Sequence, residues 1–288
     1  MDPTIFVQLL VFGLLLGSVY GLAALGLTMI WGVMGVVNVA HGALMVIGMY
    51  TVWYTASVLG LNPFVGILLA AAVLFVAGVV IHLTSIAPFM ESGGFNGLIV
   101  TVAWFLMLVA LVQILFSPTP RSLDTNLASV EIAGVFLPGG RLVGLAVTLT
   151  TVLAMVLFLQ YTHLGRAIRA TADNRESAKY VGLNVRRVDY LTFGIGASLA
   201  GIAGAVIPLI QRIDPYLGDF YLVIAFVVAV LGGLGSFYGA LLGGILVGLV
   251  EVYGAFYFSG SINQILIFLI FIFVLLFRPS GLLGGGKA

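Results

Sequence analysis

The sequence contains no cysteine, and only 7% of its 288 residues are charged. The absence of cysteine excludes disulfides, thiolate metal sites and cysteine nucleophiles, and it leaves the redox compartment undetermined. Hydrophobic residues make up 62% of the chain, which is well above the roughly 45–50% of ordinary globular domains. Apolar runs of about 18 residues or more recur along the chain, and they predict an integral membrane protein.

The chain also lacks a basic region before its first apolar run, which begins MDPTIFVQLLVFGLLLG. A cleaved signal peptide opens with such a region, so we expect the first run to remain as a membrane span. Spans of roughly 20 residues fit into the chain about eight or nine times. We therefore expect one all-α polytopic membrane domain over residues 1–288, with spans near 5–31, 42–60, 63–87, 96–117, 141–161, 190–211, 220–234, 237–257 and 262–278.

Lysine and arginine are unevenly distributed between the segments that connect these spans. If the loop at about 162–189 is cytoplasmic, eight basic residues lie on that side and three, Arg121, Arg141 and Arg212, lie on the other. By the positive-inside rule, the N-terminus is then outside and the C-terminus is cytoplasmic. The polar loop at about 118–140 falls outside, where its proline, glycine and mixed charges favour an ordered loop; a plain connector is the alternative.

Glycine is abundant, with 38 residues. Several glycines recur at a spacing of four, which places them on one face of a helix and lets two backbones approach closely in a membrane. This pattern predicts tight helix packing by Gly13, Gly17 and Gly21, by Gly239 and Gly243, and by Gly244 and Gly248.

Three apolar segments are interrupted in a way that predicts broken or re-entrant helices: 32–48, 194–208 and 231–244. Non-helical backbone at membrane depth is tolerated only where protein or a watery cavity surrounds it, and transporters build substrate paths from such breaks. The first and third segments also contain similar sequences, HGALMVIG and YGALLGGI, which suggests an internal repeat. The third break contributes Gly233, Gly235 and Ser236 as candidate pathway residues.

Three polar residues that we expect at membrane depth are further candidates for the pathway. Asn38 and His41 flank the first break, and they share a face if the backbone there is helical. The alternative for His41 is a neutral ring that donates to a backbone carbonyl of a neighbouring helix. Glu251 lies deep in a span, where a carboxylate faces the bundle interior or a partner. Its alternative is a protonated side chain bonded to a neighbouring helix.

The segment TADNRESAKYVGLNVRR (171–187) is polar and predicts a short surface helix of about eight residues over 174–182. Asp173 and Glu176 have the spacing of a capping box, and Gly182 is expected to end the helix. Flanking arginines would suffice to anchor the loop at lipid headgroups, but an anchor does not require a capped helix.

The order Glu176, Ser177, Ala178, three residues, Gly182 resembles the E-A-A-x-x-x-G signature of ABC importer permeases. The residues TFGI (192–195) stand where the longer signature has I-x-L-P. The resemblance implies a cytoplasmic coupling helix that docks in a groove of an ATPase subunit, with the coupling residues Arg175, Glu176, Ser177, Ala178, Lys179 and Gly182.

Four further segments, at 38–50, 165–188, 230–251 and 277–284, resemble the branched-chain amino acid permease family of ABC importers, most closely its H-type subunit. The resemblance implies a permease that performs no covalent chemistry and needs no cofactor or metal. It also implies a second, M-type permease, two ABC ATPases and an extracytoplasmic binding protein as partners in the inner membrane, without nucleic acid. The substrate stays open, because the family also imports urea, amides and other carboxylates.

Two other classes remain as alternatives. A secondary transporter or channel would also use broken helices, although Glu251 is the only deep acid available for ion coupling. An intramembrane hydrolase would need a nucleophile and a base, and GASLA (196–200) is one glycine short of G-x-S-x-G. A Walker-type nucleotide motif is absent, so another chain would have to bind ATP.

Overall fold

The computed structural model describes residues 3–90, 96–125, 127–132, 134–258 and 260–284. Helices occupy each of the nine predicted span ranges: α1 (Pro3–Met34), α2 (His41–Ser57), α3 (Pro63–Ile81), α5 (Asn96–Phe116), α6 (Gly139–Tyr161), α9 (Val185–Val206), α10 (Leu217–Gly232), α11 (Phe237–Tyr257) and α12 (Gly260–Phe277). A π-helical turn (His82–Ile86) joins α3 to the short α4 (Ala87–Met90).

The all-α polytopic fold is thereby confirmed. Among the described residues, six helices are long and apolar enough to cross a membrane, and the segments Leu217–Gly232 and Gln264–Phe277 are shorter apolar helices. The expected eight or nine spans agree roughly with this result. Apolar side chains also cover the outside of the bundle: Leu68, Ile114 and Leu276 are 73%, 81% and 74% exposed. Such a surface suits lipid and not water.

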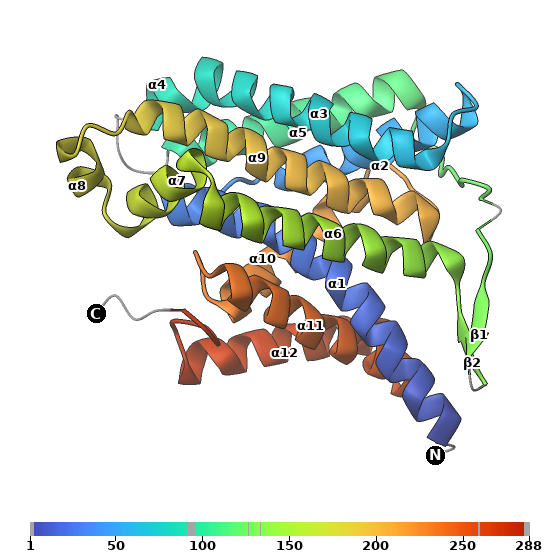
Figure 1. The fold of residues 1–288 in the computed structure, drawn as a ribbon. Helices are drawn as coiled ribbons and strands as arrows, with labels where there is room; N and C mark the ends of the chain where they lie inside the picture. The colour runs from blue at the N-terminus through green and yellow to red at the C-terminus, as the bar shows by residue number, and fades with distance from the viewer. Residues whose placement is uncertain (1–2, 91–95, 126, 133, 259, 285–288) are drawn as a thin grey trace.

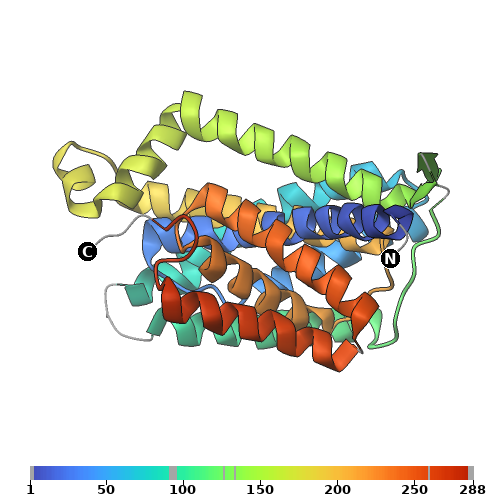
Figure 2. The ribbon, with the colours of Figure 1, turned by 90° about the horizontal axis from the view of Figure 1, so that it is seen from below.

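The helices form two groups, and α1 crosses between them (Figure 1). Helices α2, α3, α5 and α9 form the first group, and α10, α11 and α12 form the second. Helix α9 is the most buried of the long helices. One end of the bundle carries α7 (His163–Asp173) and α8 (Arg175–Tyr180), and we call it the α8 end. The opposite, hairpin end carries the antiparallel strands β1 (Val130–Ile132) and β2 (Val135–Leu137) and the start of α1 (Figures 1 and 2).

The glycine spacings of four correctly predict the most extensive helix contact in the bundle. Helices α1 and α11 pack along their glycine faces. A Cβ added at Gly17 would lie 2.6 Å from the carbonyl oxygen of Gly244, and one at Gly13 would lie 2.8 Å from the Cα of Leu249. The two backbones touch because neither helix carries a side chain at the crossing.

The first predicted break is confirmed. Helix α1 ends at Met34, residues 35–40 are non-helical, and α2 begins at His41. The hydroxyl of Thr101, on α5, accepts from the amide of Val39 (3.2 Å), and its one hydrogen is shared between the carbonyl of Val37 (3.1 Å) and that of Leu98 in its own helix (2.9 Å). A side chain of a neighbouring helix thus satisfies the backbone of the break, as a non-helical segment surrounded by protein requires.

The second predicted break is wrong. Helix α9 runs without interruption over Val185–Val206, and only its last turn, Ile207–Leu209, is a 3-10 helix. Its glycines instead admit neighbouring helices: a Cβ at Gly196 would lie 2.6 Å from the side chain of Ile30, and one at Gly201 would lie 2.7 Å from that of Leu74. Glycine in a buried helix serves close packing, which the sequence pattern does not distinguish from a break.

The third predicted break is a turn between two helices. Gly233 and Gly235 have positive φ angles of 102° and 87°, and α11 starts directly afterwards. The similar sequences HGAL and YGAL both fall in the first turn of a helix that follows non-helical backbone, α2 and α11. In both, the glycine lies against the backbone of α10, Gly42 on Gly218 and Gly239 on Gly232.

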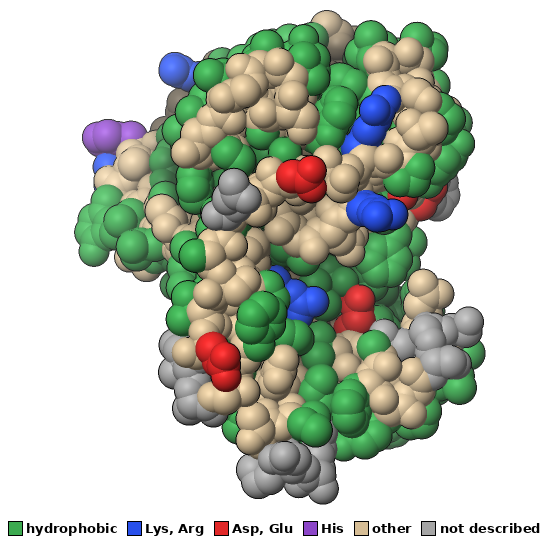
Figure 3. Space-filling view, turned by 90° about the vertical axis from the view of Figure 1, so that its right-hand side faces the viewer, with side chains coloured by type: hydrophobic (Ala, Val, Ile, Leu, Met, Phe, Trp, Pro, Cys, Tyr) green, Lys and Arg blue, Asp and Glu red, His purple; other side chains and the backbone are tan. Residues whose placement is uncertain are grey.

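The polar loop at the hairpin end is held to the bundle near its start. The backbone amide of Arg121 donates to the carbonyl of Ile213 (2.7 Å), and the amide of Ile213 donates back (2.8 Å). The Arg121 guanidinium lies 5.1 Å from the ring centre of Trp53. Figure 3 views this end, where acidic and basic side chains lie on a surface that is hollowed between two lobes.

Candidate coupling and translocation site

Helix α8 begins at a well-formed cap. Its N-cap is Asn174, whose extended backbone (φ −150°, ψ 107°) ends α7 and whose side-chain oxygen accepts from the amide of Ser177 (2.9 Å). The predicted pairing of Asp173 with Glu176 is therefore wrong, because Asp173 belongs to α7 and Glu176 is the second residue of α8. Asparagine caps a helix about as well as aspartate, so residue type alone does not distinguish Asn174 from Asp173.

The end of α8 is confirmed at Gly182. This residue has a φ of +83°, which glycine adopts without strain. The amide of Gly182 donates to the carbonyl of Lys179 (3.0 Å), and that of Leu183 donates to Ala178 (3.1 Å). This pair of bonds is a Schellman motif, which fixes the direction in which the chain leaves the helix.

An ion pair ties α8 to the bundle. Both terminal nitrogens of Arg175 donate to the carboxylate of Asp189 on α9, at 2.8 and 2.5 Å, and one of them also reaches the carbonyl of Val33 at the end of α1 (3.4 Å). The Asp189 side chain is 4% exposed, and that of Arg175 is 36% exposed. A two-pronged arginine contact with a buried carboxylate fixes orientation as well as distance.

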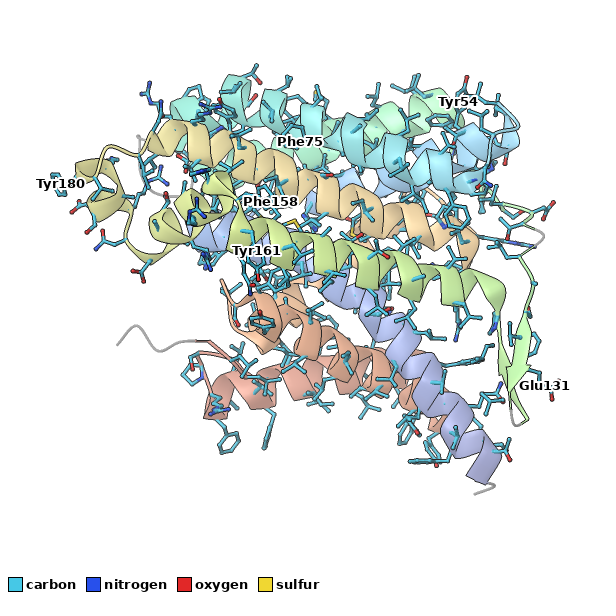
Figure 4. All side chains as sticks on the ribbon, viewed as in Figure 1. Tyr54, Phe75, Glu131, Phe158, Tyr161 and Tyr180 are labelled. Carbon is cyan, nitrogen blue, oxygen red and sulfur yellow. The ribbon has the colours of Figure 1, made fainter. Side chains whose placement is uncertain are left out.

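The remaining α8 residues divide into an inner and an outer face. Ala178 is buried against the bundle, while Glu176, Ser177 and Lys179 are exposed. Directly after them, Tyr180 and Val181 are 87% and 76% exposed, and Tyr180 lies at the outermost tip of the α8 end (Figure 4). The tip of the α8 end is therefore apolar, although the loop around it is polar.

A cavity of about 270 Å³ lies at the α8 end, between α1, α6, α7 and the turn that joins α10 to α11. Its walls are mainly apolar and include Met29, Val156 and Ile168. Its polar lining residues include Gln160, Arg169 and Tyr238. Helix α7 therefore forms part of the cavity wall and also leads directly into α8.

Of the six candidate pathway residues, Gly235 lies in this cavity. Asn38 and His41 are fully buried between helices, and the helical face that they were expected to share does not form, because Asn38 lies in the non-helical segment. The Nε2 atom of His41 lies 2.8 Å from the carbonyl oxygen of Ala23 on α1, which matches the alternative of a ring bonded across a helix contact. Among the described residues, neither polar atom of the Asn38 side chain has a partner.

The other candidates are dispersed. Ser236 caps α11 by accepting from the amide of Gly239 (3.1 Å). Gly233 lies beneath the C-terminal segment, and a Cβ there would lie 2.6 Å from the Cα of Gly284. Glu251 lies beside Tyr20 of α1. Within the described residues, these positions do not converge on one site with the first break.

The structure adds residues that the sequence did not reveal. Arg169 and Ile168 reach the cavity from α7, and Asp189 holds Arg175 across a gap of 14 residues. Such contacts depend on how helices meet, and no local pattern encodes them. Tyr180 and Val181 differ in this respect, because two large apolar residues in a polar loop are visible in the sequence itself.

Comparison with known proteins identifies the family. Residues 9–275 match the family described as the permease component of the branched-chain amino acid transport system. This chain belongs to that family. It is 33% identical to the high-affinity branched-chain amino acid transport system permease protein LivH of Escherichia coli K12 and 31% identical to BraD of Pseudomonas aeruginosa. Each comparison covers 97% of this chain and 96% of the relative.

The resemblance drawn from the sequence segments is thereby confirmed, and the chain is a polytopic membrane permease of a transport family. A more distant match is the D-allose transport system permease protein AlsC of Escherichia coli K12, which is 25% identical over 67% of this chain and 59% of the relative. Permeases for sugars and for amino acids thus share parts of this sequence.

Proposed function

We propose that this permease is the membrane-spanning subunit of an ABC importer for branched-chain amino acids, driven by separate ATPase subunits through α8. The observation that carries the proposal is the construction of α8. It is capped at Asn174, closed at Gly182 and held by Arg175, and it presents Tyr180 and Val181 away from the bundle. A rigid helix with an exposed apolar tip is suited to a groove in another subunit.

The coupling would proceed through the contacts of α8 with the bundle. Two ATPase subunits close on ATP and displace the helices docked on them. The Arg175 contacts transmit that displacement to α9 and to the end of α1, while α7 transmits it to the wall of the cavity. Access to the cavity then alternates between the two sides of the membrane. The permease itself catalyses no covalent step and requires no cofactor or metal.

The arrangement in the cell follows from the basic residues. We propose that the α8 end faces the cytoplasm of a bacterial or archaeal cell and that the hairpin end faces outward from the inner membrane. The six basic residues of the 162–189 loop support this orientation. A second, M-type permease completes the path, and an extracytoplasmic binding protein delivers the substrate at the hairpin end.

The docking surface is tested by removing its apolar tip. Exchange of both Tyr180 and Val181 for serine is expected to lower the amount of ATPase that co-purifies by about tenfold, because apolar anchors dominate protein interfaces. Gly182→Val should have a similar effect, since valine disfavours the positive φ at the end of α8. Lys179→Gln is the matched control, and it should leave co-purification and substrate-stimulated ATP hydrolysis nearly unchanged. Loss of both with Lys179→Gln alone would instead indicate an electrostatic anchor.

The orientation is tested by labelling single cysteines, for which the cysteine-free chain provides a clean background. Ser177 and Ser129 are both exposed, at the α8 end and beside the hairpin. A cysteine that replaces Ser177 should react with an impermeant thiol reagent only from the cytoplasm, and one that replaces Ser129 only from outside. The reverse pattern would overturn the proposed orientation.

A further inference from the structure

We propose that the segment after α12, residues 278–284, holds the α10–α11 turn, residues 233–236, against the end of α1 and so keeps one side of the cavity closed until α8 moves. We call the first segment the strap and the second the turn. The turn supplies Gly235 to the wall of the cavity. The inference concerns how access to the cavity is controlled, and only its effect on uptake rests on the proposed import function.

The strap begins with a reversal of the chain. The carbonyl of Arg278 accepts from the amide of Gly281 (2.8 Å), which closes a four-residue β-turn with the sequence RPSG. Proline at the second position and glycine at the fourth are residues that a type I turn favours. The reversal leads the chain from the end of α12 back to the end of α10.

The strap completes the end of α10. The last carbonyls of a helix have no partners within the helix. The amide of Leu282 donates to the carbonyl of Leu231 (2.8 Å), and that of Leu283 donates to the carbonyl of Gly232 (3.0 Å). These carbonyls belong to the last two residues of α10, directly before the turn. The strap is thus attached through backbone groups, and the attachment ends where the turn begins.

Two contacts between glycines hold the turn itself. On the strap, Gly281 is buried, and a Cβ there would lie 2.5 Å from the Cα of Gly233. On α1, a Cβ at Gly32 would lie 3.2 Å from the Cα of Gly235. The strap therefore contacts the first residue of the turn, and α1 contacts the third. Neither Gly32 nor Gly235 has a side chain to interlock, so a turn freed from the strap can move away from α1.

The contact between the turn and α1 covers part of the cavity wall. Thr28 lines the cavity one helical turn before Gly32, and so it lies on the same face of α1. Thr28 is only 2% exposed, whereas Gln160, which lines the cavity from α6, is exposed. Separation of the turn from α1 would expose the covered face of α1 to the cavity.

The α1 side of this contact adjoins the coupling helix. Arg175 of α8 reaches the carbonyl of Val33, which is the residue after Gly32. Displacement of α8 would therefore shift the end of α1 relative to a turn that the strap keeps in place. The strap provides the stationary side of the gate, and α1 provides the moving side. Without the strap, the gate would open whether or not α8 moves.

The test measures access to a cysteine at position 28 in the assembled transporter without nucleotide. Thr28→Cys should react slowly with an impermeant thiol reagent, because this position is covered. Adding Gly281→Val should raise the rate at least about tenfold, since valine disfavours the φ of +78° and the strap loses two hydrogen bonds to α10. Thr192→Cys, which is 0% exposed and outside the cavity lining, should stay unreactive with or without Gly281→Val.

Two changes at one position isolate the backbone contact. Leu283→Pro removes the amide that donates to Gly232, so it should also speed the reaction at position 28. Leu283→Ala keeps that amide and should leave the rate unchanged. The inference is overturned if neither Gly281→Val nor Leu283→Pro speeds the reaction at position 28, or if both speed the reaction of Thr192→Cys equally.

ATP-driven uptake of leucine is measured in the same preparations. Gly281→Val should lose uptake while ATP hydrolysis continues, because the cavity no longer closes on this side. Retained uptake despite fast labelling would show that the strap does not control access, and would also overturn the inference. Absence of uptake by the unmodified transporter would instead refute the import function, and the labelling rates would still decide whether the strap closes the cavity.

Discussion

Replacing Arg175 with alanine is expected to abolish coupled transport while leaving the membrane bundle folded. The change leaves the buried carboxylate of Asp189 without its partner and removes the contact with the carbonyl of Val33. Breaking a fully buried ion pair in this way costs about 3–5 kcal/mol, and the cost here is lower because Arg175 is 36% exposed. That cost falls on the attachment of α8, so transport and ATPase co-purification should be lost together. Uptake and co-purification in proteoliposomes are the measurements.

Two controls separate loss of the ion pair from loss of positive charge. Arg187→Ala removes an exposed arginine from the start of α9 and should be mild. The double change of Arg175 and Asp189 to alanine removes the unpaired carboxylate as well, and it should retain more ATPase than Arg175→Ala alone. Equal defects in Arg187→Ala and Arg175→Ala would show that charge, and not the ion pair, matters.

Gly17→Leu is expected to prevent folding of the permease. The Cβ alone would lie 2.6 Å from the carbonyl oxygen of Gly244 and 2.7 Å from the Cα of Ile245, so the clash is with backbone that cannot rotate away. Helices α1 and α11 would have to separate along their whole contact. Overpacking of a well-packed core costs about 1–3 kcal/mol, and a clash with backbone belongs at or above the top of that range. The fraction of monodisperse protein after detergent extraction should fall to background.

Gly97→Ala is the matched control within a helix. A Cβ at this position would lie 3.4 Å from a methyl carbon of Val36, which is close to ordinary van der Waals contact. The variant should extract and migrate like the unmodified protein. Normal extraction of Gly17→Leu would mean that the α1–α11 contact is looser than the glycine spacing indicates.

The sequence predicts the helices well because a membrane leaves few alternatives. Long apolar runs must become helices, since each backbone group needs an internal partner in hydrocarbon. The same reasoning fails at α9, where Gly194 and Gly204 stand in an unbroken helix. A glycine that admits a neighbouring helix and a glycine that breaks its own helix look alike until the neighbours are known.

The candidate site was predictable only where it depends on neighbouring residues in the sequence. The signature from Glu176 to Gly182 is local, so its helix and its glycine end follow from the sequence, with the cap displaced by one residue to Asn174. The cavity is assembled from four separate elements, and residues such as Met29, Val156 and Arg169 carry no signal for it in isolation. They come together only when these elements pack, so no local pattern predicts them.

The hydroxyl of Thr101 has a consequence for the order in which the protein is made. It bonds to backbone groups of Val37 and Val39, which leave the ribosome 64 and 62 residues earlier. Until α5 has been synthesised, those groups cannot find this partner, and exposure to hydrocarbon would cost several kcal/mol for each. The segment between α1 and α2 therefore has to remain near water or the insertion machinery until α5 arrives. We thus expect the segment between α1 and α2 to reach its final position in the membrane only after α5, the fourth long helix, has been synthesised. Thr101→Val should delay or misdirect insertion of α2 more than insertion of any later helix.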